Sequence, residues 1–191
     1  MISDSTGKTK ETKIKRFLAE YFNIISLEDS LGIVKYFGYD ILTFTDEFGE
    51  VIIPVILMKQ YDSSLASFGD TRSEDDFRKL LNFLLDTVEK IHAEGVIHRD
   101  IKPENILVSN NEFYLADFGI ASYNPEIFHL RAETKKDERL GNRLFSAPEQ
   151  EDSGVIAKET MDIYAIGQVL HWYIHGKTHN LFWKINFPAN E

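Results

Sequence analysis

Two stretches of sequence decide the fold of this chain. The first is His98-Arg99-Asp100-Ile101-Lys102-Pro103-Glu104-Asn105. The second is Asp117-Phe118-Gly119, which begins twelve residues after Asn105. The two motifs carry an acid (Asp100), a cation (Lys102) and two oxygen-bearing side chains (Asn105 and Asp117). An acid can accept the proton of an attacking hydroxyl, a cation can neutralise a phosphate, and Mg²⁺ prefers hard oxygen ligands. These are the groups that phosphoryl transfer from ATP requires.

The order and spacing of these residues resemble the protein kinase signature, H-R-D-x-x-x-x-N followed by D-F-G. Ala147-Pro148-Glu149 lies where that family's A-P-E motif ends the activation segment. A lysine two residues after the acid, here Lys102, is typical of serine/threonine kinases. The resemblance covers roughly residues 14–180. It implies an α+β, protein-kinase-like fold and a eukaryotic-like serine/threonine protein kinase that uses ATP and Mg²⁺ and acts on a protein substrate.

The resemblance also implies the roles of the motif residues. Asp100 would orient the substrate hydroxyl and accept its proton, and Lys102 would neutralise the γ-phosphate. Asn105 and Asp117 would hold the magnesium ions. His98 and Phe118 would be packing residues that link the catalytic loop to the core.

A second group of residues would surround the nucleotide on the side of the smaller lobe. Phe17-Leu-Ala-Glu20 fits the family's C helix, and Glu20 would pair with the lysine that contacts ATP. A surface glutamate paired only with Arg16 is the alternative. Met58 falls at the gatekeeper position, and Lys59-Gln60-Tyr61 falls at the hinge that meets adenine. The predicted nucleotide-binding residues are therefore Glu20, Met58, Gln60, Tyr61, Lys102, Asn105 and Asp117.

Two further residues have roles that the resemblance implies. Asp162 would anchor the backbone of the catalytic loop, although an acid in the first turn of a helix is also favoured by the helix dipole alone. Arg99 could meet a phosphate on the activation segment. That segment would run from Asp117 to Glu149, and Thr134 is our choice of switch site among Ser122, Tyr123, Thr134 and Ser146; an unmodified loop is the alternative.

The predicted elements follow from periodicity and turn residues. A helix from about Ile14 to Ile25 precedes a hairpin with strands at 33–45 and 51–57, in which Pro54 should make the second strand locally irregular or leave it partly unpaired. The longest helix is predicted at 74–94, capped by Ser73 and stopped by Gly95. A short hairpin at 106–115 and a helix at 159–175, ending before Gly176, complete the pattern. Residues expected to face the core are Phe77, Leu80, Leu81, Leu84, Leu85, Val88 and Ile91, followed by Ile163, Ile166, Val169, Leu170 and Ile174.

The chain also departs from the family. Neither the glycine-rich loop nor the strand bearing the ATP-contacting lysine is recognisable before Glu20, where Lys8, Lys10 and Lys13 are the available lysines. The last helices of the large lobe are missing, so Glu149 lacks an evident partner. Before A-P-E, the chain has Gly141-Asn142 where serine/threonine kinases usually carry Gly-Thr, followed by Phe145 at the position of the usual aromatic residue, and the Asn142 substitution puts substrate preference in doubt. We therefore expect a polar segment (1–13), a partial N-lobe with hinge (14–61) and a partial C-lobe (62–191), with weak nucleotide affinity and little turnover.

Composition narrows the alternatives. The chain has 31 acidic and 21 basic residues and no cysteine, which argues against nucleic-acid binding and excludes disulfides. The longest apolar run, 51–58, is too short to span a bilayer, and we expect a cytoplasmic protein without membrane partners. His171, His175 and His179 recur every four residues, but Gly176 should separate the last from the helix. A pseudokinase-like scaffold and a small-molecule phosphotransferase remain as alternative functions.

Overall fold

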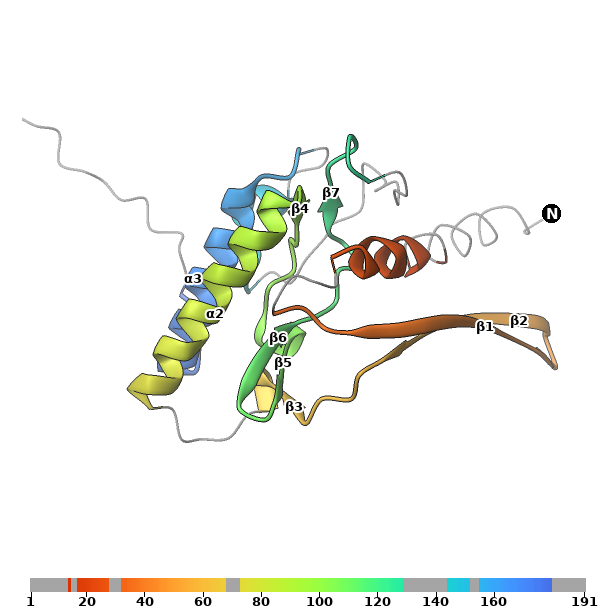
Figure 1. Ribbon diagram of the computed structural model, residues 1–191, viewed down its shortest axis with the longest axis horizontal. Helices are drawn as coiled ribbons and strands as arrows, with labels where there is room; N and C mark the ends of the chain where they lie inside the picture. Colours follow the sequence, from red (N-terminus) through yellow and green to blue (C-terminus); the bar gives the residue numbers. More distant parts are fainter. Residues whose placement is uncertain are drawn as a thin grey trace, which may run out of the picture.

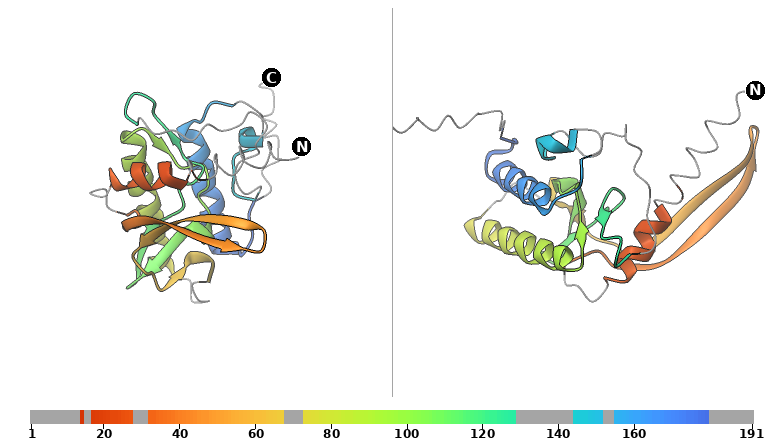
Figure 2. Two further views of the ribbon diagram at one scale, coloured as in Figure 1. Left: turned by 90° about the vertical axis from the view of Figure 1, so that its right-hand side faces the viewer. Right: turned by 90° about the horizontal axis from the view of Figure 1, so that it is seen from above.

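A computed structural model of the chain describes residues 14, 17–27, 32–67, 73–128, 144–151 and 155–179. Figure 1 shows two long helices, α2 (Glu74–Ala93) and α3 (Glu159–His175), lying side by side at one end of the molecule. At the other end a ribbon of two strands, β1 (Tyr36–Asp46) and β2 (Gly49–Met58), reaches away from the body. Figure 2 shows the same arrangement from two further directions. The predicted α+β class is confirmed.

Local signals fix the N-terminal end of α2 and the C-terminal ends of both long helices. Ser73 caps α2 by accepting a hydrogen bond from the backbone N–H of Asp76 and donating one to its carboxylate. The chain leaves α2 through Gly95, which has a φ of 76°, and leaves α3 through Gly176, which has a φ of 69°. Glycine adopts this left-handed conformation without the steric cost that a Cβ brings, so both helices end where the sequence predicts.

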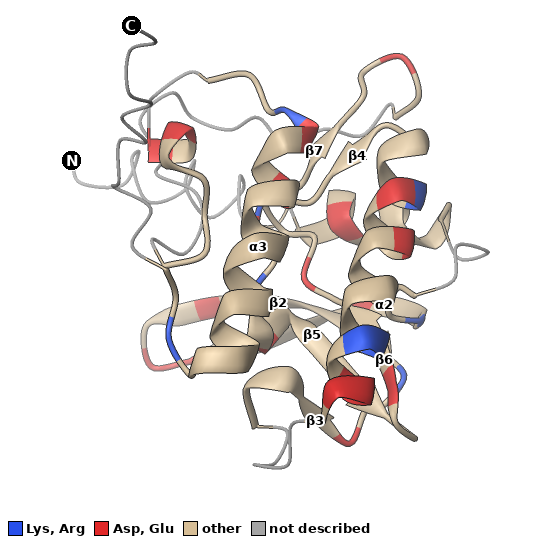
Figure 3. Ribbon diagram, turned by 90° about the vertical axis from the view of Figure 1, so that its left-hand side faces the viewer, with Lys and Arg blue, Asp and Glu red and all other residues tan. Residues whose placement is uncertain are grey.

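The two helices differ in where their charged residues lie. Charged side chains recur along α2, whereas α3 carries its only acidic residues, Glu159 and Asp162, in the first turn (Figure 3). Burial matches the predicted faces only in part. Leu85, Ile163 and Ile174 are 45%, 52% and 58% exposed, so their predicted place in the core is wrong. Apolar periodicity identifies a face of a helix, but neighbouring elements decide how much of that face is covered.

The β1–β2 ribbon forms the predicted hairpin, with Glu47 and Phe48 at its tip. The prediction that Pro54 would disturb it is wrong, because Pro54 pairs with Ile41 in unbroken register. The irregularity lies instead between Tyr36 and Gly38. Each strand of a two-stranded ribbon has one edge that pairs with no other strand. A proline whose nitrogen faces that edge removes no hydrogen bond between the two strands.

Three short strands form a second sheet in the order β3 (Ser63–Ser64), β5 (Ile106–Ser109) and β6 (Glu112–Leu115). Asn110 and Asn111 make the turn between β5 and β6, both with positive φ, which asparagine tolerates better than most residues. A third pairing joins β4 (Val96–Ile97) to β7 (Ser122–Tyr123). The described residues also form three short 3₁₀ helices, η1 (Leu65–Ser67), η2 (Pro103–Asn105) and η3 (Pro148–Glu151).

One apolar core joins these elements to the helix formed by residues 17–25. Ile24 of that helix, Leu84 of α2, Leu115 of β6 and Val169 of α3 are all completely buried. Strands β4 and β6 lie between the α2–α3 pair and the β1–β2 ribbon (Figure 1). None of the helices in the described part of the chain is long and apolar enough to cross a membrane.

Candidate active site

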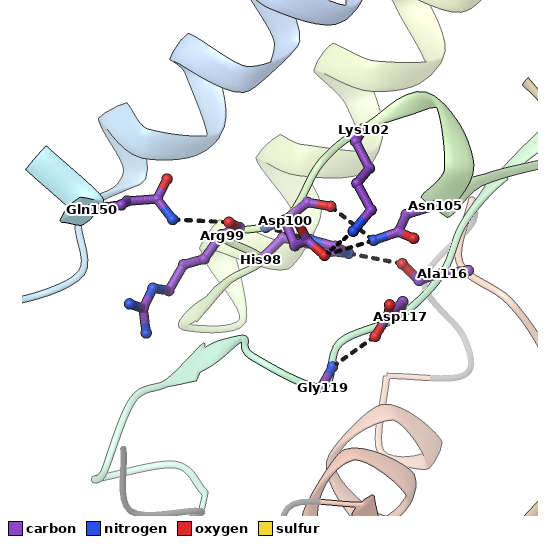
Figure 4. A network of polar contacts seen from close by, with 9 residues as sticks. All are labelled: His98, Arg99, Asp100, Lys102, Asn105, Ala116, Asp117, Gly119 and Gln150. Carbon is purple, nitrogen blue, oxygen red and sulfur yellow. Dashed lines mark hydrogen bonds and ion pairs between the residues drawn. The ribbon is translucent and has the colours of Figure 1, made fainter. Parts of the chain in front are cut away.

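The loop after β4 and the short turn η2 bring three of the predicted residues together (Figure 4). The Lys102 Nζ atom lies 2.6 Å from Asp100 Oδ2. Asn105 donates from Nδ2 to the Asp100 backbone oxygen at 2.9 Å and to Asp100 Oδ2 at 3.1 Å. Asp100 Oδ2 is therefore occupied by two donors, while no described residue donates a hydrogen bond to Oδ1, which could accept the proton of an incoming hydroxyl.

The residues predicted to hold magnesium have a suitable donor set. The Asn105 side chain is 7% exposed and turns its nitrogen toward Asp100, which leaves its carbonyl oxygen as an acceptor. Asp117 is exposed and has a φ of 63°, and its Oδ1 accepts a long 3.4 Å hydrogen bond from the Gly119 N–H. No group of three or more His, Cys, Asp or Glu side chains in the described residues could hold a metal ion by itself. The remaining Mg²⁺ ligands would have to be phosphate and water oxygens, as is usual for this ion.

Asp162 fixes the backbone of the catalytic loop from below. Its carboxylate, fully buried in the first turn of α3, accepts hydrogen bonds from the His98 and Arg99 N–H groups at 2.8 and 2.7 Å. It also lies 2.8 Å from His92 Nε2. The anchoring contact predicted for Asp162 is present, and it explains how Arg99 can keep a φ of 70°.

Gln150 holds the same loop from the other side, and the sequence did not identify it. Its Nε2 donates to the Arg99 backbone oxygen at 2.9 Å, and its Oε1 accepts from the Ala147 N–H at 3.2 Å. The side chain is 6% exposed, so both ends of the amide are used in a buried position. The only sequence feature that points to Gln150 is its position directly after the A-P-E motif. Its partner, the Arg99 oxygen, lies 51 residues away in the sequence, so the contact could not be predicted.

His98 connects the two loops of the site. Its Nδ1 accepts from the Asp100 N–H at 3.2 Å, and since that nitrogen must then be unprotonated, its Nε2 donates to the Ala116 oxygen at 3.1 Å. Its ring lies 4.5 Å from that of Phe118, and both side chains are buried, as predicted for packing residues. Burial lowers the pKa of His98, because a charged imidazolium would lose its hydration there.

Glu20 reaches the site from the helix at 17–25. Its Oε1 accepts a 2.6 Å hydrogen bond from the Tyr36 hydroxyl, and burial raises its pKa. The predicted partner was a lysine, but no lysine of the described residues forms an ion pair with Glu20. The candidate lysines, Lys8, Lys10 and Lys13, and the alternative partner Arg16 lie outside the described residues.

The predicted hinge connects β2 to β3. The Lys59 N–H donates to the Lys35 oxygen at 2.9 Å, and the Tyr61 hydroxyl accepts from the Lys35 N–H at 3.0 Å. Tyr61 also packs against Tyr114, so its side chain braces the connection, while Met58 and Gln60 are exposed. A cavity of about 500 Å³ between α2 and the β5–β6 turn is lined by none of the predicted nucleotide-binding residues, so we assign it no part in nucleotide binding.

Beyond Gly119, the described part of the activation segment is only partly accessible. Burial raises the pKa of the Tyr123 phenol, whose hydroxyl lies 3.4 Å from the Phe118 oxygen. Arg99 Nη1 lies 3.5 Å from the Ile120 oxygen, a weak contact. Ser122 and Ser146 are half-buried, and Phe145 is buried. The switch site Thr134 and the pair Gly141-Asn142 lie outside the described residues, as does the polar segment at 1–13, and Glu149 forms no ion pair among the described ones.

The three histidines near the end of α3 are closer together than the sequence indicated. Gly176 ends the helix as predicted, but the chain then turns back, and the His179 ring lies 5.0 Å from that of His171. His175 lies 4.4 Å from His171. These rings do not make a metal site among the described residues.

Comparison with known proteins agrees with this geometry. The family model of the protein kinase domain matches residues 5–186, and the chain belongs to the protein kinase family. It is 29% identical over 182 residues to a probable serine/threonine-protein kinase PknB of Lactococcus lactis, covering 91% of this chain and 26% of the relative. It is 27% identical over 175 residues to the mitogen-activated protein kinase KSS1 of Saccharomyces cerevisiae, covering 90% and 46%.

A third relative, the serine/threonine-protein kinase PknH of Mycobacterium tuberculosis, is 35% identical over 98 residues, which cover 51% of this chain and 15% of PknH. The chain thus spans less than half the length of each of these relatives.

Proposed function

We propose that this chain carries the catalytic centre of a serine/threonine protein kinase that moves the γ-phosphate of ATP to a protein hydroxyl. The observation that carries the proposal is the Asp100–Lys102–Asn105 cluster on a loop whose backbone is held by Asp162 and Gln150. In a loop without a catalytic role, nothing would require an aspartate to be held by both a lysine and an asparagine, as Asp100 is here.

The described side chains support the steps of such a transfer. Asp100 Oδ1 accepts the proton of the substrate hydroxyl while the hydroxyl oxygen bonds to the γ-phosphorus. The bond from that phosphorus to the β–γ bridging oxygen breaks, and ADP leaves with the bonding electrons. Lys102 stands beside Asp100 and can neutralise the oxygens of the phosphate in transit.

Asn105 and Asp117 would hold Mg²⁺, which when bound offsets the negative charge of the phosphates. Because neither a glycine-rich loop nor an apolar strand with an ATP-contacting lysine is recognisable in the sequence before Glu20, we propose that the chain by itself binds nucleotide weakly and turns over slowly. Electrostatic positioning supplies most of the rate in this reaction, so a missing cation has a large effect.

The first test is Mg²⁺-dependent binding of a fluorescent ATP analogue to the 191-residue chain and to Asp117→Asn. The second is transfer of labelled γ-phosphate to a library of serine and threonine peptides, with Asp100→Asn as the inactive variant. Glu104→Gln is the matched control, since Glu104 is an exposed acid on the same loop. We expect both single-residue variants to lose their signal and the control to keep it.

Other results would favour the alternatives. A chain that binds no nucleotide with or without Mg²⁺ would favour a scaffold. Labelled phosphate that appears on small hydroxyl compounds but not on any peptide would favour a small-molecule phosphotransferase. Activity retained in Asp100→Asn would contradict the role given to that residue.

A further inference from the structure

Among the described residues, the hydrogen-bond partner of the Glu20 carboxylate is a tyrosine. The Tyr36 hydroxyl donates to Glu20 Oε1 at 2.6 Å, a short distance that is typical of a hydrogen bond to a charged acceptor. Tyr36 is the first residue of β1 and is 5% exposed, and its ring stacks on Tyr21 at 6.2 Å between centroids. The hydroxyl is thus held in place by a packed ring, and it joins the ribbon to the helix at 17–25.

The other side of the Glu20 carboxylate faces the Asp117-Phe118-Gly119 loop. The Phe118 backbone amide lies close enough to this carboxylate to lower the pKa of Glu20. At Gly119, the position of a Cβ would lie 3.4 Å from Glu20 Oε2 and 3.2 Å from Asp117 Oδ1, so the two carboxylates flank this residue closely. A carboxylate so placed touches the loop that carries a predicted magnesium ligand.

We propose that Tyr36 is a positioning residue that holds the Glu20 carboxylate against the Asp117-Phe118-Gly119 loop and thereby fixes the position of Asp117. The consequence for nucleotide binding rests on the proposed kinase function. The hydrogen bond itself, and its effect on Glu20, do not.

The Tyr36 hydroxyl favours the charged form of the Glu20 carboxyl group. Burial raises the pKa of Glu20 most strongly, the nearby Asp117 charge raises it further, and the Tyr36 hydrogen bond opposes both by stabilising the charged form. Burial and the Glu20 charge also raise the pKa of Tyr36, so its hydroxyl stays protonated and remains a donor. The titratable groups that face Glu20 are Tyr36 from β1, Asp117 from its loop and Tyr123 from β7.

Without the hydroxyl, the charged form of Glu20 loses its donor on the ribbon side while its burial is unchanged. The carboxylate then either takes up a proton or turns toward water. In both cases the contact with the Asp117 loop weakens, and the loop becomes free to move away from the position in which Asp117, together with Asn105, would bind the proposed Mg²⁺.

The test compares Tyr36→Phe with Tyr39→Phe in the 191-residue chain. Phenylalanine keeps the ring of Tyr36 and removes only the hydroxyl. Tyr39 is a matched control, because its ring also contacts Tyr21, at 5.0 Å, but its hydroxyl has no hydrogen-bond partner among the described residues. The readouts are the pKa of the Glu20 side-chain carboxyl, followed by ¹³C NMR as the pH is changed, and the Mg²⁺-dependent affinity for a fluorescent ATP analogue.

In Tyr36→Phe we expect the Glu20 pKa to rise and the affinity near neutral pH to fall roughly tenfold, as loss of one hydrogen bond to a charged group implies. Tyr39→Phe should change neither quantity. An unchanged Glu20 pKa in Tyr36→Phe would overturn the inference and leave the kinase proposal standing. If the unaltered chain binds no nucleotide, the kinase proposal fails, and the NMR titration still decides whether Tyr36 controls Glu20.

Discussion

Asp100 owes its position to the peptide groups on either side of Arg99. A non-glycine residue with a φ of 70° costs on the order of 1–3 kcal/mol, and it persists where surrounding contacts hold it. Here Asp162 accepts from the N–H of Arg99, and Gln150 donates to its carbonyl oxygen. Asp117 has a similar φ of 63°, so two of the four non-glycine residues with positive φ in the described chain carry or flank the predicted chemistry.

Replacement of Gln150 by glutamate tests this arrangement. The acid keeps the shape of the side chain but places a second acceptor against the Arg99 oxygen, while the Ala147 N–H keeps its partner. We expect the free energy of unfolding to fall by about 1–3 kcal/mol, because a buried acceptor loses its donor. Phosphate transfer should fall more than nucleotide affinity does, because Gln150 holds the loop of Asp100 and contacts neither Asn105 nor Asp117.

Urea denaturation and separate measurements of kcat and nucleotide affinity would check this. Asn111→Asp is the matched control, since it makes the same amide-to-acid change at an exposed turn. Equal losses of stability in both variants, or an unchanged kcat in Gln150→Glu, would contradict the positioning role.

At the scale of elements, the sequence predicted best what local interactions decide. The bounds of α2 and α3 are confirmed almost to the residue. The capping serine that begins α2 and the left-handed glycine that follows each helix act within a few residues of the helix end, whereas α3 begins after Lys158 without a side-chain cap. The consequences of Pro54 and the burial of Ile163 and Ile174 were predicted wrongly. Both depend on which edge or face another element covers, and a single stretch of sequence does not contain that information.

Gly95 offers a direct test of one such helix end. A Cβ at this position would lie 2.7 Å from the Asn124 Cβ atom and 3.0 Å from Ile127 Cδ1, in addition to the strain of a φ of 76°. Gly176 has a similar φ but open space around it. We therefore expect Gly95→Ala to lower the unfolding free energy by about 2–4 kcal/mol and Gly176→Ala by about 1 kcal/mol.

Thermal and urea denaturation of the two variants would measure the difference. If they lose the same amount, the collision with Asn124 contributes nothing, and the cost at Gly95 is backbone strain alone.

The β1–β2 ribbon exposes an unusual amount of apolar surface for its length. Phe37, Leu42, Ile53 and Leu57 are between 41% and 63% exposed, and Phe48 at the tip is 90% exposed. No further strand pairs with either edge among the described residues. Apolar ribbons with free edges associate with one another in solution.

We accordingly expect the 191-residue chain to self-associate as its concentration rises, and Ile53→Lys to reduce this association. The lysine places a charge in the apolar patch, and it should cost little stability because Ile53 is already 41% exposed. Sedimentation velocity would measure the effect, with Thr45→Lys as a control that adds the same charge at an exposed polar position. A chain that is monomeric at all concentrations would contradict the expectation.

At the scale of the whole molecule, the sequence predicted that Asp100, Lys102 and Asn105 lie together but not how their loop is held. The motif spacing brought Asp100, Lys102 and Asn105 together as expected, because they share one short loop. Tyr36 and Gln150 were not predicted, because their partners lie 16 and 51 residues away, and such pairs form only when the core brings separate elements together.

That core also makes global stability depend on pH through His98. The buried ring is neutral in the folded state, and protonation would place a donor at Nδ1 against the Asp100 N–H. The folded-state pKa lies below its ordinary value of 6.5, so His98 contributes stability that is complete above pH 6.5 and is lost as pH falls through the folded-state pKa. Glu20 acts in the opposite sense: its folded-state pKa is raised above 4.5, so its contribution is present below pH 4.5 and is lost as pH rises through the raised value.

Urea denaturation of the unaltered chain and of His98→Asn, between about pH 5 and about pH 8, separates these two effects. Asparagine can accept from the Asp100 N–H but does not titrate. We expect the difference in unfolding free energy between the two proteins to shrink as pH falls below 6.5, by at most about 1.4 kcal/mol per pH unit. His175→Asn makes the same substitution at an exposed position and serves as the control. A constant difference across this range would mean that His98 is protonated in the folded protein as readily as in the unfolded chain, and its assigned hydrogen bonds would then be wrong.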